Sequence, residues 1–103
     1  MPQYPAPPIE AVTITGVLFA LSDPSRLRII AELDRLDAES ICDHLGGELA
    51  KSTRSHHLKT LRTAGLTHTR TQGRYNYVSL RREELDARFP GLLDAVLAHA
   101  PVD

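Results

Sequence analysis

The sequence contains no tryptophan, a single methionine and a single cysteine, and aromatic residues make up only 5% of its 103 residues. One cysteine, Cys42, cannot form an internal disulfide, which is the usage expected in a reducing cytoplasm. The longest unbroken apolar run covers residues 17–21, far fewer than a bilayer span needs. Four prolines among the first eight residues exclude the apolar core of a signal peptide. We therefore expect a soluble cytoplasmic protein that has no membrane segment.

The chain also lacks the groupings that enzymes use. Its histidines and carboxylates form no set of nucleophile, base and orienting residue, and it has no glycine-rich phosphate loop. Catalysis and a bound cofactor are therefore not expected. With 103 residues and 42% apolar content, the chain is long enough for one domain with a modest core and too short for two. Because domains of this size commonly complete their core by pairing, a homodimer is considered from the outset.

Acidic residues are missing from one long stretch. Between residues 51 and 82 the chain carries eight basic residues and no aspartate or glutamate, whereas the remainder holds the other four basic residues and all thirteen acidic residues. The near-neutral total charge of −1 therefore conceals two regions of opposite sign. Because a solvated surface normally mixes both signs, the basic stretch favours a polyanion-binding face over an ordinary charged surface.

The basic stretch begins with residues 51–65, which have the features of a DNA-recognition helix. Leu58 and Leu61 supply an apolar stripe that would dock the helix on a core, and Gly65 supplies its C-terminal stop. Small hydroxyl residues crowd the first turn, where free backbone N–H groups favour a phosphate. The candidate DNA contacts that lie largely off the apolar stripe are Lys51, Ser52, Ser55, His56 and Lys59.

Two segments are predicted at the start of the chain. Residues 1–8 are expected to form a disordered or extended arm, because proline removes backbone donors and excludes a helical register. Residues 9–21 are expected to form a helix that is apolar on two sides, with Ile14, Val17, Leu18 and Leu21 on one and Ile9, Val12 and Phe19 on the other. Such a helix needs two partners, and the second is either the same core or a twin subunit.

Two helices are predicted between this segment and the basic stretch. Asp23 caps the first and Pro24 occupies its first turn. That helix runs to about residue 36, and its predicted buried side consists of Leu27, Ile29, Ile30, Leu33 and Leu36. Arg26 lies among these apolar positions, so we expect it to have a structural role in an ion pair or cap. A short helix at residues 40–45 then forms a helix-turn-helix with residues 51–65.

The content becomes β-type after Gly65. Residues 66–71 and 74–80 predict two strands joined at Gln72-Gly73, which together form a two-stranded wing. Arg70 and Arg74 flank the tip of this wing, where they could reach a phosphate or a minor groove. The alternative is that both are solvated hairpin arginines.

The last predicted helix begins near Arg82 and is interrupted at Pro90. It resumes with an apolar stripe made of Leu92, Leu93, Val96, Leu97 and Ala100. In so small a chain this stripe is a second candidate for a dimer interface, beside the two-sided first helix.

Three stretches together resemble the ArsR family of bacterial winged-helix repressors. They are LSDPSRLRIIAEL, AKSTRSHHLKTLRTAGL and RTQGRYNYVSL, and the match spans about residues 14–97. The resemblance implies a mainly α fold with a small β-hairpin, in a winged helix-turn-helix domain that we place at residues 9–100. It further implies a homodimer joined through the first and last helices, which represses transcription at an inverted repeat until an inducer releases it.

The resemblance also implies roles for individual residues. Ser52, Thr53, Ser55 and His56 would meet the major groove, and Arg70 and Arg74 would lie on the wing. The chain departs from the family at Ala50, where a capping serine is usual, and at Arg54, where an aliphatic residue is usual. Arg54 could therefore extend to a phosphate, and its role stays open.

The family includes metal sensors, but the usual ligand pairs are missing from this chain. Cys42 has no second cysteine, and the adjacent His56 and His57 diverge around a helix axis. Asp94 and His99 are five residues apart and also diverge, so only a site shared between subunits could use them. We therefore expect no metal site. Cys42 is expected to be a buried apolar residue, with a thiol sensor as the alternative.

Two functions remain in competition. The first is a regulator that binds palindromic double-stranded DNA as a homodimer and responds to a small-molecule or redox inducer. The second is a winged helix used as a protein-interaction module, because a fold does not determine a function. The acid-free basic stretch on the recognition helix and wing favours DNA.

Overall fold

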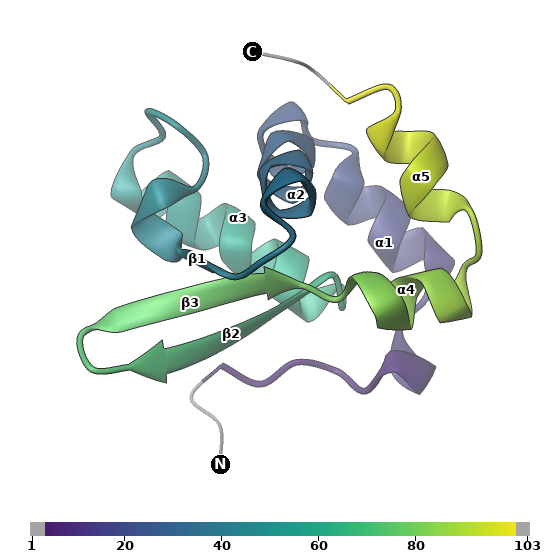
Figure 1. The fold of residues 1–103 in the computed structure, drawn as a ribbon, viewed down its shortest axis with the longest axis horizontal. Helices are drawn as coiled ribbons and strands as arrows, with labels where there is room; N and C mark the ends of the chain where they lie inside the picture. The colour runs from purple at the N-terminus through teal and green to yellow at the C-terminus, as the bar shows by residue number, and fades with distance from the viewer. Residues whose placement is uncertain (1–3, 101–103) are drawn as a thin grey trace.

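The computed structural model describes residues 4–100, and Figure 1 shows its helices gathered on one side of a small sheet whose hairpin projects beyond them. The helices are α1 (Ile14–Leu21), α2 (Pro24–Leu36), α3 (Lys51–Thr63), α4 (Arg82–Arg88) and α5 (Leu92–Leu97). The strands are β1 (Ser40–Ile41), β2 (Thr67–Gln72) and β3 (Tyr75–Leu80). Two 3-10 turns are η1 (Ile9–Ala11) and η2 (Cys42–His44). This is a mainly helical winged helix-turn-helix fold, as predicted.

The wing is a three-stranded antiparallel sheet in the order β1-β3-β2. The predicted hairpin is present, but Gln72 pairs with Tyr75, so the turn consists of Gly73 and Arg74, one position later than expected. Gly73 has a φ of 62°, the positive value that a two-residue hairpin turn needs at its first position. The third strand was not predicted, because its short segment pairs with β3 residues far along the chain.

The predicted short helix at residues 40–45 is wrong. Ser40 and Ile41 pair with Val78 and Tyr77 of β3, and only the single 3-10 turn η2 follows before Leu45. Backbone hydrogen bonds to β3 are available to this segment in the folded chain, and they replace the first helical turn. The helix-turn-helix is therefore formed by α2, η2 and α3.

The predicted helix over residues 9–21 is also wrong as a continuous element. Val12 and Thr13 are extended between η1 and α1. The Thr13 hydroxyl accepts a hydrogen bond of 3.1 Å from the Gly16 N–H and so caps α1 at its true start. A hydroxyl beside β-branched neighbours competes with helical backbone bonds, which explains the break.

The helix α2 begins as predicted, because the Asp23 carboxylate accepts a hydrogen bond of 3.1 Å from the Arg26 N–H and Pro24 occupies the first turn. Ile29, Ile30 and Leu33 of α2 are buried in the core. Leu36, predicted to be buried with them, is 55% exposed. It lies in the last turn of the helix, just before the chain reverses at the left-handed Asp37, and no described element covers that turn.

The recognition helix ends at Gly65 as predicted. The Gly65 and Leu66 N–H groups donate hydrogen bonds of 3.0 Å to the carbonyls of Arg62 and Leu61, which is the Schellman arrangement for a glycine at this position. Gly65 has a φ of 92°. A Cβ added to it would lie 2.3 Å from a methyl group of Val12, so the packing of the segment before α1 against α3 requires glycine here.

Residues 4–8 run without helix or strand beside α3 and the sheet (Figure 1). The Asn76 amide donates a hydrogen bond of 3.0 Å to the Tyr4 hydroxyl, and the Arg62 guanidinium lies 4.9 Å from the centre of the Tyr4 ring. The described part of the predicted arm is thus extended and in contact with the domain. Residues 1–3 of that arm lie outside the described residues, and the boundary at residue 9 stays a prediction.

The C-terminal helical region is interrupted near Pro90 as predicted, between α4 and α5. Leu93 is buried, and Leu92, Val96 and Leu97 are partly buried against the core. Within residues 4–100, no helix combines the length and the apolar character required to cross a membrane.

Candidate nucleic-acid interface

The helix α3 presents a polar face to solvent and an apolar face to the core. Leu58 and Leu61 are buried, as predicted. All six candidate contacts on this helix are exposed, namely Lys51, Ser52, Thr53, Ser55, His56 and Lys59. The structure therefore places them on one accessible helix without a carboxylate among them.

The N-terminus of α3 has no side-chain cap. Ala50 occupies the capping position, and no acidic residue lies in the first turn. Its first backbone N–H groups therefore lack a side-chain acceptor from the described residues. This departure from the family pattern leaves those donors and the positive end of the helix dipole available to an anion.

Arg54 does not belong to the exposed face. Its Nε donates a hydrogen bond of 2.7 Å to the Leu45 carbonyl, and a terminal nitrogen donates one of 3.0 Å to the Leu49 carbonyl. Both carbonyls lie in the turn between η2 and α3. Arg54 therefore ties this turn to the recognition helix, and its role at this unusual position is structural.

A polar cluster holds the inner side of α3 against the first two helices. Arg26 is only 8% exposed, and its Nε donates a hydrogen bond of 2.7 Å to the Ala20 carbonyl. Its guanidinium also lies 3.2 Å from Nδ1 of His57, whose Nε2 is 3.8 Å from the Asp23 carboxylate. Burial opposes ionisation of Asp23, but the Arg26 N–H hydrogen bond and the nearby His57 lower its pKa. Arg26 is thus structural, as predicted.

A hollow of about 290 Å³ separates α3 from the wing. Lys51 and Ser55 line it from α3, and Arg74 and Tyr75 line it from the hairpin. The exposed Arg74 therefore lies in the turn of the wing across from the first turns of the recognition helix. The structure brings these predicted residues of two separate elements around one concave surface.

Arg70 is already engaged within the protein. Its guanidinium donates hydrogen bonds to both carboxylate oxygens of Glu39, one of them at 3.0 Å, and lies 4.6 Å from the centre of the Tyr77 ring. The hydrogen bonds from Arg70 lower the pKa of Glu39, and the same bonds raise the pKa of Arg70. Unlike Arg74, it would have to exchange this partner before it could bind a phosphate.

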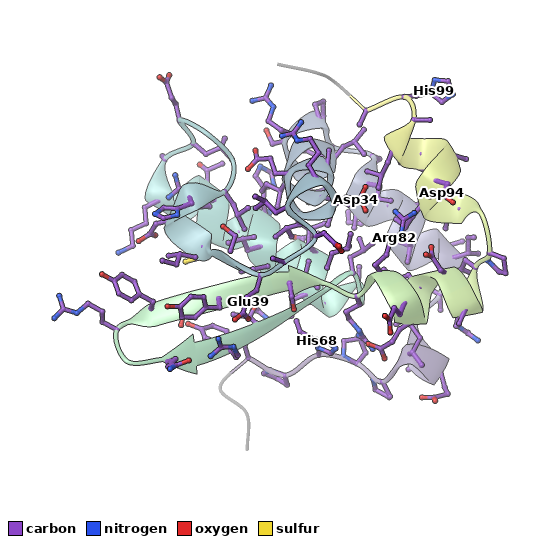
Figure 2. All side chains as sticks on the ribbon, in the orientation of Figure 1. Asp34, Glu39, His68, Arg82, Asp94 and His99 are labelled. Carbon is purple, nitrogen blue, oxygen red and sulfur yellow. The ribbon has the colours of Figure 1, made fainter. Side chains whose placement is uncertain are left out.

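Two more arginines of the basic stretch are paired with carboxylates. Arg81 is 4% exposed and binds both carboxylate oxygens of Glu84 at 3.0 Å. Arg82 contacts Asp34 of α2 at 3.1 Å and also Asp94 of α5, and it lies between them in Figure 2. The charge surplus counted along the sequence is therefore reduced by folding. Among the described residues, the basic side chains of the stretch without a carboxylate partner are Lys51, Arg54, Lys59, Arg62 and Arg74.

The candidate sensor residues do not converge within the described part of the chain. No three or more His, Cys, Asp or Glu residues among residues 4–100 are placed to hold a metal ion. Asp94 contacts Arg82, and His99 lies apart from it beyond the end of α5 (Figure 2). Cys42 is half-buried, and burial together with Asp43 raises the pKa of its thiol, which disfavours the reactive thiolate.

The helix-turn-helix domain family matches residues 21–70. The chain is also 46% identical over 79 residues to YceK of Bacillus subtilis (strain 168), named as an uncharacterized HTH-type transcriptional regulator, and the match covers 75% of this chain and 79% of YceK. A solved ArsR-like transcriptional regulator from Rhodococcus sp. RHA1 is 28% identical with a TM-score of 0.58, over 82% of this chain and 85% of that one. The chain belongs to the ArsR family of helix-turn-helix transcriptional regulators.

A further crystal structure, named as an ArsR family transcriptional regulator, has a TM-score of 0.66 at 24% identity and covers 80% of this chain and 90% of that one. At that identity the similarity supports the shared winged fold alone. As an ArsR-family regulator the chain is a DNA-binding protein, and α3 is the second helix of its helix-turn-helix. The family assignment confirms the resemblance seen in the sequence.

Proposed function

We propose that this ArsR-family protein represses transcription by binding an inverted-repeat operator as a homodimer, with one α3 helix of each subunit in the major groove. The observation that carries the proposal is the exposed polar face of α3, which has an uncapped N-terminus and no carboxylate. Its opposite face is fixed to the core by Leu58 and Leu61. A rigidly docked helix with short polar side chains is suited to reading base edges.

The proposed DNA contacts fall into two groups, those that recognise base edges and those that bind the DNA backbone or the minor groove. Ser52, Thr53, Ser55 and His56 have side chains short enough to reach base edges when the helix lies in the groove. Lys51, Lys59 and Arg74 carry positive charges that are free of carboxylate partners in the described chain, and we assign them to phosphates or the minor groove. Arg70 is assigned a secondary role, because Glu39 occupies its guanidinium.

Exposed apolar residues support the homodimer. Ile14 and Leu18, four residues apart on α1, are 42% and 47% exposed and form a stripe that the described chain leaves uncovered. The helix α5 carries the partly buried Leu92, Val96 and Leu97. We propose that α1 and α5 form the dimer interface, since burying such a stripe favours association.

The proposed inducer is not a metal ion. Asp94 is held by Arg82, and His99 lies away from it (Figure 2), so a site shared between subunits would first have to break this ion pair. Titration of zinc, cadmium, nickel or arsenite into the protein–DNA complex should leave its affinity unchanged. Submicromolar, stoichiometric binding of any of them with loss of DNA would reverse this part of the proposal.

The decisive experiment is genome-wide recovery of the DNA bound by the full chain, followed by titration of the recovered sequences. A twofold dimer should select a palindrome whose half-sites are about 10 bp apart centre to centre, or a multiple of that distance. Deletion of the gene should raise transcription next to these sites. Recovery of proteins but of no preferred DNA sequence would favour an interaction module instead.

A further inference from the structure

A second hollow, distinct from the one beside the wing, lies between α1 and α3. It has a volume of about 520 Å³, within the usual range for small-molecule sites. Val12 and Phe19 line it from α1 and the segment before it, while His56, Lys59, Thr63 and Ala64 line it from α3 and its C-terminal end. The cavity therefore opens beside two of the residues proposed to contact DNA.

The charge of this cavity is one-sided. Lys59 is the only formally charged residue in its lining, and no aspartate or glutamate lines it. The Lys59 ammonium has no hydrogen bond or ion pair within residues 4–100, so a ligand would not have to displace a protein partner. A cavity with one free cation and no carboxylate is complementary to a ligand with one anionic group.

The remaining lining favours an apolar body attached to that anionic group. Phe19 is 66% exposed and lines the cavity, whereas Val12 in the same lining is 2% exposed. Gly16 lines the α1 wall without a side chain, and a Cβ there would lie 3.0 Å from the Thr13 hydroxyl. Covering Phe19 would remove a large apolar surface from water, which favours binding.

The cavity and the proposed dimer interface use different sides of α1. Gly16 and Leu18 are two positions apart and so project about 200° apart around a helix axis. Gly16 lines the cavity, whereas Leu18 belongs to the exposed stripe with Ile14. Pairing of subunits through that stripe therefore leaves the cavity wall accessible to a ligand.

We propose that this cavity binds a small amphipathic anion, a carboxylate or phosphate monoester on an apolar body, and that its binding weakens the hold on DNA. The second half rests on the proposed function, because it requires Lys59 and His56 to contact DNA. One ammonium group cannot fully neutralise a ligand anion and a DNA phosphate together, so the two compete for Lys59. The site thereby supplies a chemical class for the inducer.

The binding test uses the ¹⁵N-labelled full chain without DNA. Octanoate, 2-naphthoate and 2-naphthyl phosphate serve as anionic probes, and 2-naphthamide serves as their neutral counterpart. We expect the anions to shift the backbone N–H signals of Thr13, Gly16 and Thr63. The neutral 2-naphthamide should bind about tenfold more weakly, since it lacks a charge-assisted contact. The carboxylate and phosphate arms show which head group is preferred. If none of the three anions shifts these signals at millimolar concentration, the site does not exist.

Matched variants separate the cavity from general electrostatics. Lys59→Gln should abolish the preference for anions over the neutral probe. Lys51→Gln removes the same charge from the same helix but at the other hollow, so it should preserve that preference. Ala11→Phe should fill the cavity from its rim and weaken every probe, without removing a proposed DNA contact. If Lys59→Gln and Lys51→Gln reduced the preference for anionic probes equally, the proposal would be overturned.

The regulatory half is tested separately with fluorescently labelled operator DNA. At a concentration that saturates the wild-type cavity, the preferred anion should lower the affinity of the wild-type protein for operator DNA about tenfold. The same concentration should leave the DNA affinity of Ala11→Phe unchanged. DNA binding measured without any probe tests the proposed function alone. The shifts of the backbone N–H signals, measured without DNA, test the cavity alone. Saturation of the cavity with unchanged DNA affinity would overturn its role as an inducer site.

Discussion

Arg54 donates a hydrogen bond of 2.7 Å to the carbonyl of Leu45, which precedes the glycine turn between η2 and α3. A second bond reaches Leu49 in the same turn. Arg54 therefore stabilises the helix-turn-helix through hydrogen bonds within the motif. Its guanidinium holds this turn against the recognition helix, and this role separates it from the exposed cations nearby.

Arg54→Ala should lower stability and leave the salt dependence of DNA binding unchanged. The substitution removes the partners of two turn carbonyls, and we expect a loss of about 1–3 kcal/mol in the free energy of unfolding. Urea denaturation measures this loss, with the exposed Lys51→Ala as a control that should be nearly neutral. A stable Arg54→Ala protein with a shallower salt slope would instead make Arg54 a phosphate contact.

His56→Ala and Arg74→Ala should impair DNA binding in different ways. Loss of a base-reading side chain should cost about 1–3 kcal/mol on the operator and much less on random DNA. Loss of Arg74 should weaken both DNAs alike and reduce the salt slope by about one unit for each phosphate that the variant no longer binds. Titrations of operator and random duplex at several salt concentrations measure both effects. Intact discrimination in His56→Ala, together with its loss in Arg74→Ala, would make the wing the reader.

Glu39→Gln should strengthen DNA binding, because it frees Arg70 on the wing. We expect a steeper salt slope by about one unit for each subunit whose arginine binds an additional phosphate. Protein stability should change little, as is usual for an exposed ion pair. Glu83→Gln makes the same charge change on α4, away from the wing, and should leave the slope unaltered. Equal slopes for both variants would show that Arg70 does not reach DNA.

Glu84 should make stability depend on acidic pH. Hydrogen bonds from Arg81 lower its pKa from an ordinary 4.5 to about 2, with a further contribution from His68. Because this folded-state pKa is depressed, the stabilisation is present above pH 4.5 and is lost as the pH falls toward 2. The carboxylate is partly exposed, so we expect only about 1 kcal/mol after solvent screening. Unfolding of Glu84→Gln against pH should show a gap from wild type that closes on acidification. A gap that stays constant to pH 2 would rule out this linkage.

Leu18→Glu should convert the proposed dimer into a monomer, because it places a charge in the exposed stripe of α1. Light scattering should give twice the 11.4 kDa chain mass for wild type and the single mass for the variant. Leu36→Glu is the matched control, since Leu36 is a similarly exposed leucine on α2 outside the proposed interface. Dissociation by both variants alike, or by neither, would argue against α1 as the interface.

Elements whose signals are local in the sequence could be predicted. Asp23 and Pro24 start α2 through bonds within one turn, and Gly65 ends α3 through its own backbone conformation. The strand at residues 40–41 could not be predicted in this way, because its hydrogen bonds are made with β3, which follows much later in the chain. Strand formation there depends on the completed hairpin and not on local preference.

The candidate site shows the same division between local and distant causes. The exposed face of α3 follows from helical spacing alone, and all of its predicted residues are accessible. The charge count along the sequence overstated the free positive surface, because Arg70 pairs with Glu39, 31 residues away. Linear counting cannot recognise such a pair, whose members meet only when the segment before β1 reaches the hairpin.

The docking of residue 4 has a practical consequence for any fusion protein. Tyr4 lines the hollow between α3 and the wing together with Lys51 and Ser55. An affinity tag or fluorophore attached just ahead of Tyr4 would therefore begin close in space to the proposed DNA contacts. A label after α5 would instead emerge on the side of the domain away from the hairpin (Figure 1). Surface immobilisation through the C-terminal end is therefore the better design for measurements of DNA affinity.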